Sequence, residues 1–214
     1  NVTPAANLAH VVAGRRSLSE AVVEAPGGFG LIPGASGLAQ MAALNATERQ
    51  RLMAEMAKLE AEADVVLIDT GAGVSPNVLG FLVAADQVLV VTTREPTAIT
   101  DAYALIKTLT RQRHTADIAL VANMVEGERE GRAVADRISG VCRQFLNVKI
   151  HFAGHVVSDP QVTASVQQRR PLSIEPGKAP AGGCFSELAH RLDRSAADPP
   201  TDSLLKRLAA WLGR

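Results

Sequence analysis

The chain has 214 residues, 47% of them hydrophobic and 3% aromatic, which suits one compact domain with an aliphatic core and a small appendage. Its formal net charge is zero, which argues against a broad nucleic-acid-binding face. Cys142 and Cys184 form no CxxC pair, which argues against a disulfide framework or a thiolate metal site.

Apolar runs typical of strands alternate with helical patterns along the chain. The middle three of these runs are continuously apolar, as parallel strands covered by helices on both faces are. The expected strands are Phe29–Pro33, Val65–Asp69, Gln87–Thr92, Ile118–Asn123 and Lys149–Val157.

Helical patterns occupy the segments between these strands. The first two open with a capping-box pair, a Ser or Thr followed three residues later by Glu or Gln, and the third opens with a proline. The expected helices are Ser17–Val23, Thr47–Ala61, one that begins at Pro76, Thr97–Arg111, Arg129–Phe145 and Glu187–Arg194. Strand–helix repetition of this kind predicts an α/β fold with a mostly parallel sheet and helices on both faces.

The end of the chain predicts a separate element. Residues 1–194 form the expected main domain, residues 195–201 (SAADPPT) have linker composition, and residues 202–214 form an amphipathic helix. This helix spans roughly 20 Å at 1.5 Å per residue, too little to cross a bilayer. Its apolar face either lies in a membrane surface or packs on the protein or a partner. That face consists of Leu204, Leu205, Leu208, Trp211 and Leu212.

A carboxylate stands at the end of the second expected strand. Asp69 follows the apolar run VVLI, and Thr70 to Gly73 then form a loop of small residues that a phosphate can approach closely. Because ligands bind at the carboxyl ends of parallel strands, Asp69 fits a Walker B aspartate that helps to hold magnesium. The alternative is an aspartate that only caps the next turn.

The sequence around Asp69 resembles the MinD/ParA-type P-loop ATPases. Residues 69–73 (DTGAG) resemble the switch II motif DxxxG of that family. The phrases TGAG, AADQVLVVTT and EPTAITDAYALIK are most similar to its FlhG (FleN) group of flagellar-number regulators, and NLAHVVAGRRSLSEAVVEAPGGFGLIPGASG extends the similarity over nearly the whole chain. The resemblance implies a SIMIBI-type P-loop NTPase fold and an ATPase with ATP and Mg²⁺ as cofactors.

The resemblance also implies roles for single residues. Asp69 would be catalytic, acting on magnesium through water and on the attacking water. Asn123 would contact the adenine, since an amide both donates and accepts at the purine edge; the alternative is a turn residue after a strand. The implied nucleotide-binding residues are Thr70, Gly71, Gly73, Asn123, Asp159 and Pro160.

The P-loop itself is absent from these 214 residues. Neither GGFGLIPGASG nor PGKAPAGG satisfies GxxxxGK(S/T), and both are expected to be loops. In the family, the P-loop and the N-terminal strand before it lie upstream of the position of Asn1. Without that strand the sheet is expected to expose unpaired backbone and apolar surface. We therefore expect the 214 residues by themselves to bind ATP weakly and not to hydrolyse it.

The resemblance implies an ATP-dependent homodimer in the cytoplasm, peripheral on the inner face of the membrane, that controls flagellar number and placement. The implied partners are an SRP-type flagellar GTPase (FlhF) and flagellar switch or regulatory proteins. MinD-family proteins carry a C-terminal membrane-targeting helix, so the resemblance favours the membrane for residues 202–214. Two alternatives stay open, namely a division-site or partitioning ATPase and a non-catalytic interaction module that has lost its P-loop.

Overall fold

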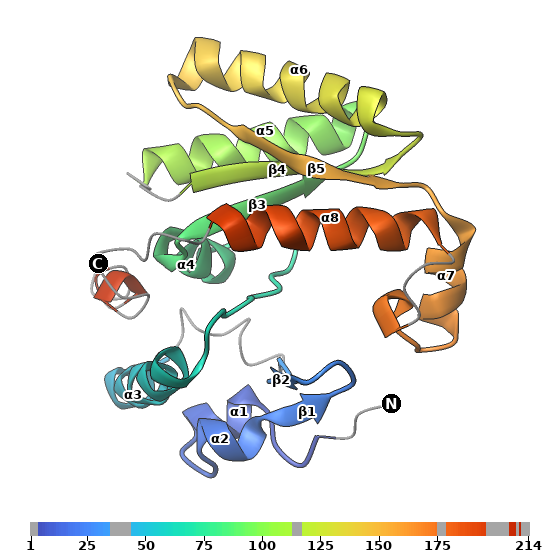
Figure 1. Ribbon diagram of the computed structural model, residues 1–214. Helices are drawn as coiled ribbons and strands as arrows, with labels where there is room; N and C mark the ends of the chain where they lie inside the picture. The colour runs from blue at the N-terminus through green and yellow to red at the C-terminus, as the bar shows by residue number, and fades with distance from the viewer. Residues whose placement is uncertain are drawn as a thin grey trace. The chain divides into compact units, whose positions relative to one another are not determined.

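The computed structural model describes residues 4–34, 44–112, 117–174, 179–195, 206–208 and 210 (Figure 1). The chain divides into two compact units. Unit 1 comprises Asn1–Ala84 and Asp202–Arg214, and unit 2 comprises Ala85–Thr201. The expected division into a main domain, a linker and a terminal helix stays a prediction, and most of its last two parts lies outside the described residues.

Unit 1 consists of helices and one small antiparallel hairpin. Its elements are α1 (Leu8–Val12), α2 (Leu18–Ala21), β1 (Val23–Ala25), β2 (Phe29–Leu31), α3 (Ala46–Glu62) and α4 (Pro76–Ala84). The Ser17–Glu20 capping box predicted for α2 is confirmed, and Pro76 begins α4 as expected. The cap of α3 was predicted wrongly, because Asn45 with Glu48, and not Thr47 with Gln50, makes the reciprocal hydrogen bonds.

The core of unit 1 joins distant parts of the chain. Leu52 of α3, Val11 of α1 and Leu208 near the C-terminus are fully buried in one cluster, which Phe81 and Ala84 of α4 complete. Polar contacts tie the same elements, since the Glu55 carboxylate accepts from the Leu18 N–H at 2.7 Å and Arg207 Nε donates to the Ala84 carbonyl at 2.7 Å. Unit 1 is therefore stabilised by contacts between residues as far as 123 positions apart in the sequence.

Unit 2 is a parallel sheet of three strands in the order β3-β4-β5. Its elements in chain order are β3 (Gln87–Thr92), α5 (Pro96–Arg111), β4 (Asp117–Val125), α6 (Glu128–Leu146), β5 (His151–Val157), α7 (Pro160–Gln167), the 3-10 turn η2 (Leu172–Ile174) and α8 (Pro180–Ser195). Figure 1 shows α5 and α6 on one side of this sheet and α8 on the other. The predicted α/β class with helices on both faces of a parallel sheet is confirmed.

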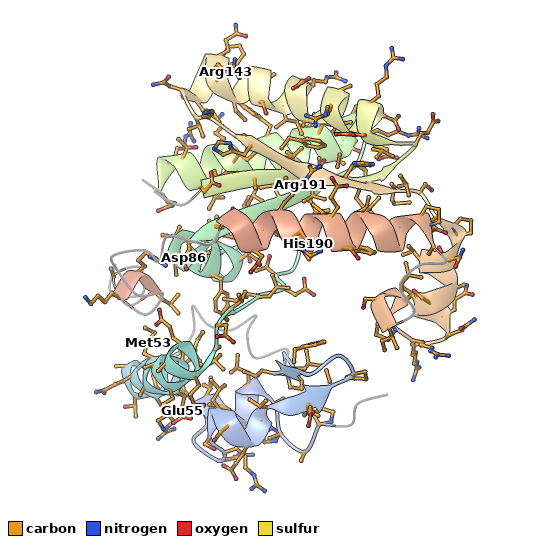
Figure 2. The ribbon with its side chains drawn as sticks, in the orientation of Figure 1. Met53, Glu55, Asp86, Arg143, His190 and Arg191 are labelled. Atoms are coloured by element: carbon orange, nitrogen blue, oxygen red, sulfur yellow. The ribbon has the colours of Figure 1, made fainter. Side chains whose placement is uncertain are left out.

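Side chains alternate between the two faces of the unit 2 sheet. On one face, Ala119, Val121 and Ala153 pack with Ala181 and Leu188 of α8. Arg191 also lies on the side of α8 next to the sheet (Figure 2), and its Nη1 donates to the Ala153 carbonyl at 3.1 Å. On α5 and α6, the positions facing the sheet are apolar at helical spacing, as buried Ala102, Ile106, Leu109, Val134, Ala135, Ile138 and Cys142 indicate. Burial raises the pKa of the Cys142 thiol to about 11, so this group is an uncharged part of the core.

The strand predicted at Val65–Asp69 is absent from the structure. Residues 65–71 have neither helix nor strand, and Val65 and Leu67 are 71% and 85% exposed. A strand requires a neighbour that exchanges ladder hydrogen bonds, and the two strands described in unit 1 pair only with each other. Among the residues that the structure describes, the apolar run therefore has no strand to pair with.

Two other elements differ from the sequence predictions. The strand near Phe29 is antiparallel, in a hairpin with β1, and the first residue of β1, Val23, had been assigned to the end of a helix. The glycines of PGKAPAGG do not all lie in a loop, because α8 begins at Pro180 and contains Gly182 and Gly183. Among the described residues, no helix is both long and apolar enough to span a bilayer.

Candidate functional site

The carboxyl ends of β3, β4 and β5 lie at one edge of the unit 2 sheet, because the three strands are parallel. Arg94 follows β3, Asn123 lies near the end of β4, and Asp159 follows β5. Ligands of parallel α/β sheets bind at such an edge. The sequence predictions for Asn123, Asp159 and Pro160 thus fall at one place in the fold.

Asn123 lies in an irregular part of β4. The register with β5 shifts between Ala122 and Val125, and Met124 has a left-handed backbone with φ 57°. The Asn123 Oδ1 accepts from the Met124 N–H at 2.9 Å, and the Ser158 N–H donates to the Val125 carbonyl at 2.9 Å. Asn123 is half-buried at this irregularity of the strand, and bulges are common beside ligand sites.

Asp159 joins the beginnings of two helices. One carboxylate oxygen accepts from the Gln161 N–H at 2.9 Å, capping α7, and the other accepts from the Ala181 N–H at 3.2 Å at the start of α8. Pro160 occupies the first turn of α7, where its missing N–H costs nothing. The Asp159 carboxylate thus orients the segment after β5.

A charged network that the sequence predictions missed links the β3 and β4 ends. Glu130 of α6 accepts from the Glu126 N–H at 2.7 Å and from Arg94 Nη1 at 3.2 Å. Arg94 also lies 3.5 Å from the Glu126 carboxylate. These hydrogen bonds hold the pKa of Glu130 below its ordinary value, first through the Glu126 N–H and then through Arg94. A signal was present, because a glutamate at the third position of a helix often reaches back to the backbone before it.

The segment predicted to be switch II belongs to unit 1 and is open to solvent. Asp69, Gly71 and Gly73 are exposed, and Thr70 is half-buried. A methyl group added at Gly71 or Gly73 would meet no atom within 4 Å. Gly73 has φ +98°, a conformation that a residue with a side chain rarely adopts. The loop is therefore sterically able to receive a phosphate group.

Asp69 is also compatible with magnesium. The described part of the chain has no group of three or more His, Cys, Asp or Glu side chains that could together hold a metal ion. Mg²⁺ does not require such a group, because it keeps several waters and binds through one or two carboxylates together with substrate phosphates. An exposed single aspartate beside a glycine loop is compatible with that mode.

The predicted lipid-binding face is described at one position only. Leu208 is completely buried in the core of unit 1, as the alternative in which the helix packs on the protein requires. A side chain buried in this way does not contact lipid in the same state. The other predicted members of the face, Leu204, Leu205, Trp211 and Leu212, lie outside the described residues.

Comparison with known proteins decides the family. The antiactivator FleN of Pseudomonas aeruginosa is 34% identical over 192 residues, which cover 90% of this chain and 69% of FleN. The chain belongs to the FlhG/FleN group of MinD/ParA-type proteins. The flagellum site-determining protein YlxH of Helicobacter pylori is 31% identical, with 97% of this chain and 72% of YlxH covered. A scan against protein-family models found no match.

Solved structures agree with this family at the level of the fold. The MinD cell division protein of Aquifex aeolicus superposes with a TM-score of 0.66 at 18% identity, covering 93% of this chain and 78% of MinD. A chain of the MinC:MinD cell division protein complex of the same organism gives a TM-score of 0.67 at 17% identity, with 94% of this chain and 77% of that chain covered. The predicted MinD-like fold is thereby confirmed, and MinD/ParA-type proteins as a family are ATPases.

Proposed function

We propose that this FlhG/FleN-type protein is an ATP-switched regulator of flagellar number and placement. The observation that carries the proposal is the identity of 34% with an antiactivator and 31% with a flagellum site-determining protein, each over at least 90% of the chain. In this proposal ATP with Mg²⁺ joins two subunits, and hydrolysis of ATP separates them. The protein acts in the cytoplasm, peripheral on the inner face of the membrane, with FlhF and flagellar switch or regulatory proteins as partners.

The chemistry of the described residues supports nucleotide binding. Asn123 offers an amide at the carboxyl edge of the unit 2 sheet, and Asp159 with Pro160 orients the segment expected to flank the base. Asp69, Thr70, Gly71 and Gly73 provide a carboxylate and a loop that phosphates can approach. Bound Mg²⁺ would supply neutralisation of the phosphate charge.

Flagella and septa provide the test of the biological role. We expect cells of the source organism that lack this protein to change the number or position of their flagella while their septa stay in place. Counting flagella by electron microscopy and septa by membrane staining measures both. Misplaced septa with normal flagella would instead support the division-site role, which the septum site-determining MinD of Bacillus subtilis, 26% identical, makes the second candidate.

Membrane binding by residues 202–214 is part of the proposal. The helix is expected to exchange between two states, one with Leu208 in the core of unit 1 and one with the apolar face in a lipid surface. ATP-driven dimerisation would favour the second state. The basic residues of the polar face, Lys206, Arg207 and Arg214, would then lie near anionic headgroups.

Liposome sedimentation tests this exchange. We expect the full-length natural protein to sediment with vesicles containing anionic lipid more strongly with ATP than with ADP, and to lose that binding when residues 202–214 are deleted. Vesicles of neutral lipid are the matched control, because only the electrostatic part should be lost there. Equal sedimentation of the intact and the shortened protein would refute the membrane role.

A further inference from the structure

The backbone that follows Asn123 is fixed at three successive residues. The Met124 N–H donates to Asn123 Oδ1, the Val125 carbonyl accepts from the Ser158 N–H, and the Glu126 N–H donates to Glu130 Oε2. The last of these bonds is the shortest, at 2.7 Å, and its acceptor comes from helix α6. The left-handed backbone at Met124 is thus flanked by hydrogen bonds from the segment after β5 and from α6.

Arg94 reaches the same point from the segment after β3. Its Nη1 lies 3.2 Å from Glu130 Oε1 and 3.5 Å from Glu126 Oε1. The Glu130 side chain is 31% exposed, whereas that of Glu126 is 85% exposed, so Glu130 is the more enclosed partner. Exposed ion pairs of this kind contribute little to stability. The contacts of Arg94 therefore matter here for how they position Glu130 and Glu126.

The orientation of the Asn123 amide depends on this backbone. Since the Met124 N–H is a donor, it must face the amide oxygen and not the amide NH₂, which fixes which end of the side chain points where. Adenine presents the N6 donor next to a ring-nitrogen acceptor, a pattern that a fixed Asn amide matches with its oxygen and its NH₂. Guanine presents the O6 acceptor in place of that donor. Guanine O6 would then face the oxygen of the Asn123 amide, and two acceptors form no hydrogen bond.

We propose that Glu130 is a positioning residue for base selectivity: by holding the Glu126 N–H, with Arg94 as support, it keeps the Asn123 amide in the orientation that accepts adenine and disfavours guanine. This inference rests on the proposed function, in which Asn123 contacts the base. Glu130 itself touches no nucleotide in this arrangement. Its effect passes through residues 124–126.

Paired affinities for ATP and GTP, measured with Mg²⁺ on the full-length natural protein, test the inference. Glu130→Ala is expected to reduce the preference for ATP over GTP by about 3- to 10-fold, mainly through weaker ATP binding, as loss of one positioning hydrogen bond does. Glu130→Gln should keep most of the preference, because its amide oxygen still accepts from the Glu126 N–H. Arg94→Ala should have a smaller effect than Glu130→Ala.

The matched control is Glu128→Ala. Glu128 lies two residues earlier in the first turn of α6, and it pairs with Arg132 of the same helix at 2.7 Å. Glu128 lies at the same end of α6 and carries the same charge as Glu130, but it does not accept a hydrogen bond from the Glu126 N–H. We expect its ATP preference to equal that of the wild type, and circular dichroism establishes that each variant is folded.

The possible outcomes separate the inference from the proposed function. If Glu130→Ala keeps the wild-type preference, or if Glu128→Ala loses as much, the positioning role is overturned while ATP binding stands. If the wild type itself binds ATP no better than GTP, the role of Asn123 in the proposed function falls, and the inference falls with it. If Glu130→Ala does not fold, Arg94→Ala decides, and an unchanged preference in that variant overturns the inference.

Discussion

Replacing Asp69 with asparagine is expected to reduce ATP hydrolysis by the full-length natural protein about 10²- to 10³-fold, with a much smaller effect on ATP binding. The reason is that a magnesium ion supplies several kcal/mol of charge stabilisation to the transition state, and each ~1.4 kcal/mol is worth a factor of ten in rate. Asparagine keeps the shape of the side chain but loses the negative charge that, in the proposed function, would hold the hydrated ion. Phosphate release under saturating ATP and Mg²⁺ measures the effect.

Asp64→Asn is the control for this experiment. Asp64 is an exposed carboxylate five positions upstream, in the same segment that precedes the glycine loop. Its replacement changes the net charge equally and should leave hydrolysis at the wild-type rate. A wild-type rate for Asp69→Asn would remove this residue from the magnesium site. A wild-type protein without any hydrolysis would instead favour the interaction module that has lost its P-loop.

Replacing Leu208 with alanine is expected to destabilise unit 1 by about 2–5 kcal/mol, the usual cost of truncating a fully buried leucine. The loss combines the apolar surface returned to water with the cavity left beside Leu52 and Phe81. Urea unfolding of the 214-residue chain, followed by the fluorescence of its only tryptophan, Trp211, measures the change in the free energy of unfolding.

Ala210→Ser provides the comparison for Leu208. Ala210 is exposed, so its substitution should change the free energy of unfolding by no more than about 0.5 kcal/mol. If Leu208→Ala also changes the free energy of unfolding by less than about 0.5 kcal/mol, the terminal segment does not contribute to the core of unit 1 in solution. The packed state proposed as the alternative to membrane binding would then be lost.

Local sequence patterns were sufficient where an element is determined by its own residues. The strand Gln87–Thr92 was predicted to the residue, and Asp117–Val125 to within two, because these runs are continuously apolar and flanked by polar turns. The capping box at Ser17 and the proline start at Pro76 were equally local signals. The α/β class followed from the alternation of these elements.

The candidate site was predicted in its individual residues but not in its supporting contacts. Asn123 and Asp159 follow strands, so their place at the carboxyl edge follows from parallel pairing. The bond between Arg94 and Glu130 joins positions 36 apart in sequence, and the Asp159 contact with Ala181 joins positions 22 apart. No pattern in a single sequence specifies such pairs, because they depend on how the loops and helices meet.

The sequence by itself determined that this is a MinD-like α/β chain, since the apolar strands, the DTGAG loop and the EPTAITDAYALIK helix are each readable from neighbouring residues. The tertiary structure alone decided what the apolar side chains do. Val65 and Leu67 have the composition of a buried strand yet are exposed, because a strand needs a partner for its backbone hydrogen bonds. Leu208 has the pattern of a lipid-facing residue yet is buried, because the core of unit 1 offers its side chain an apolar site.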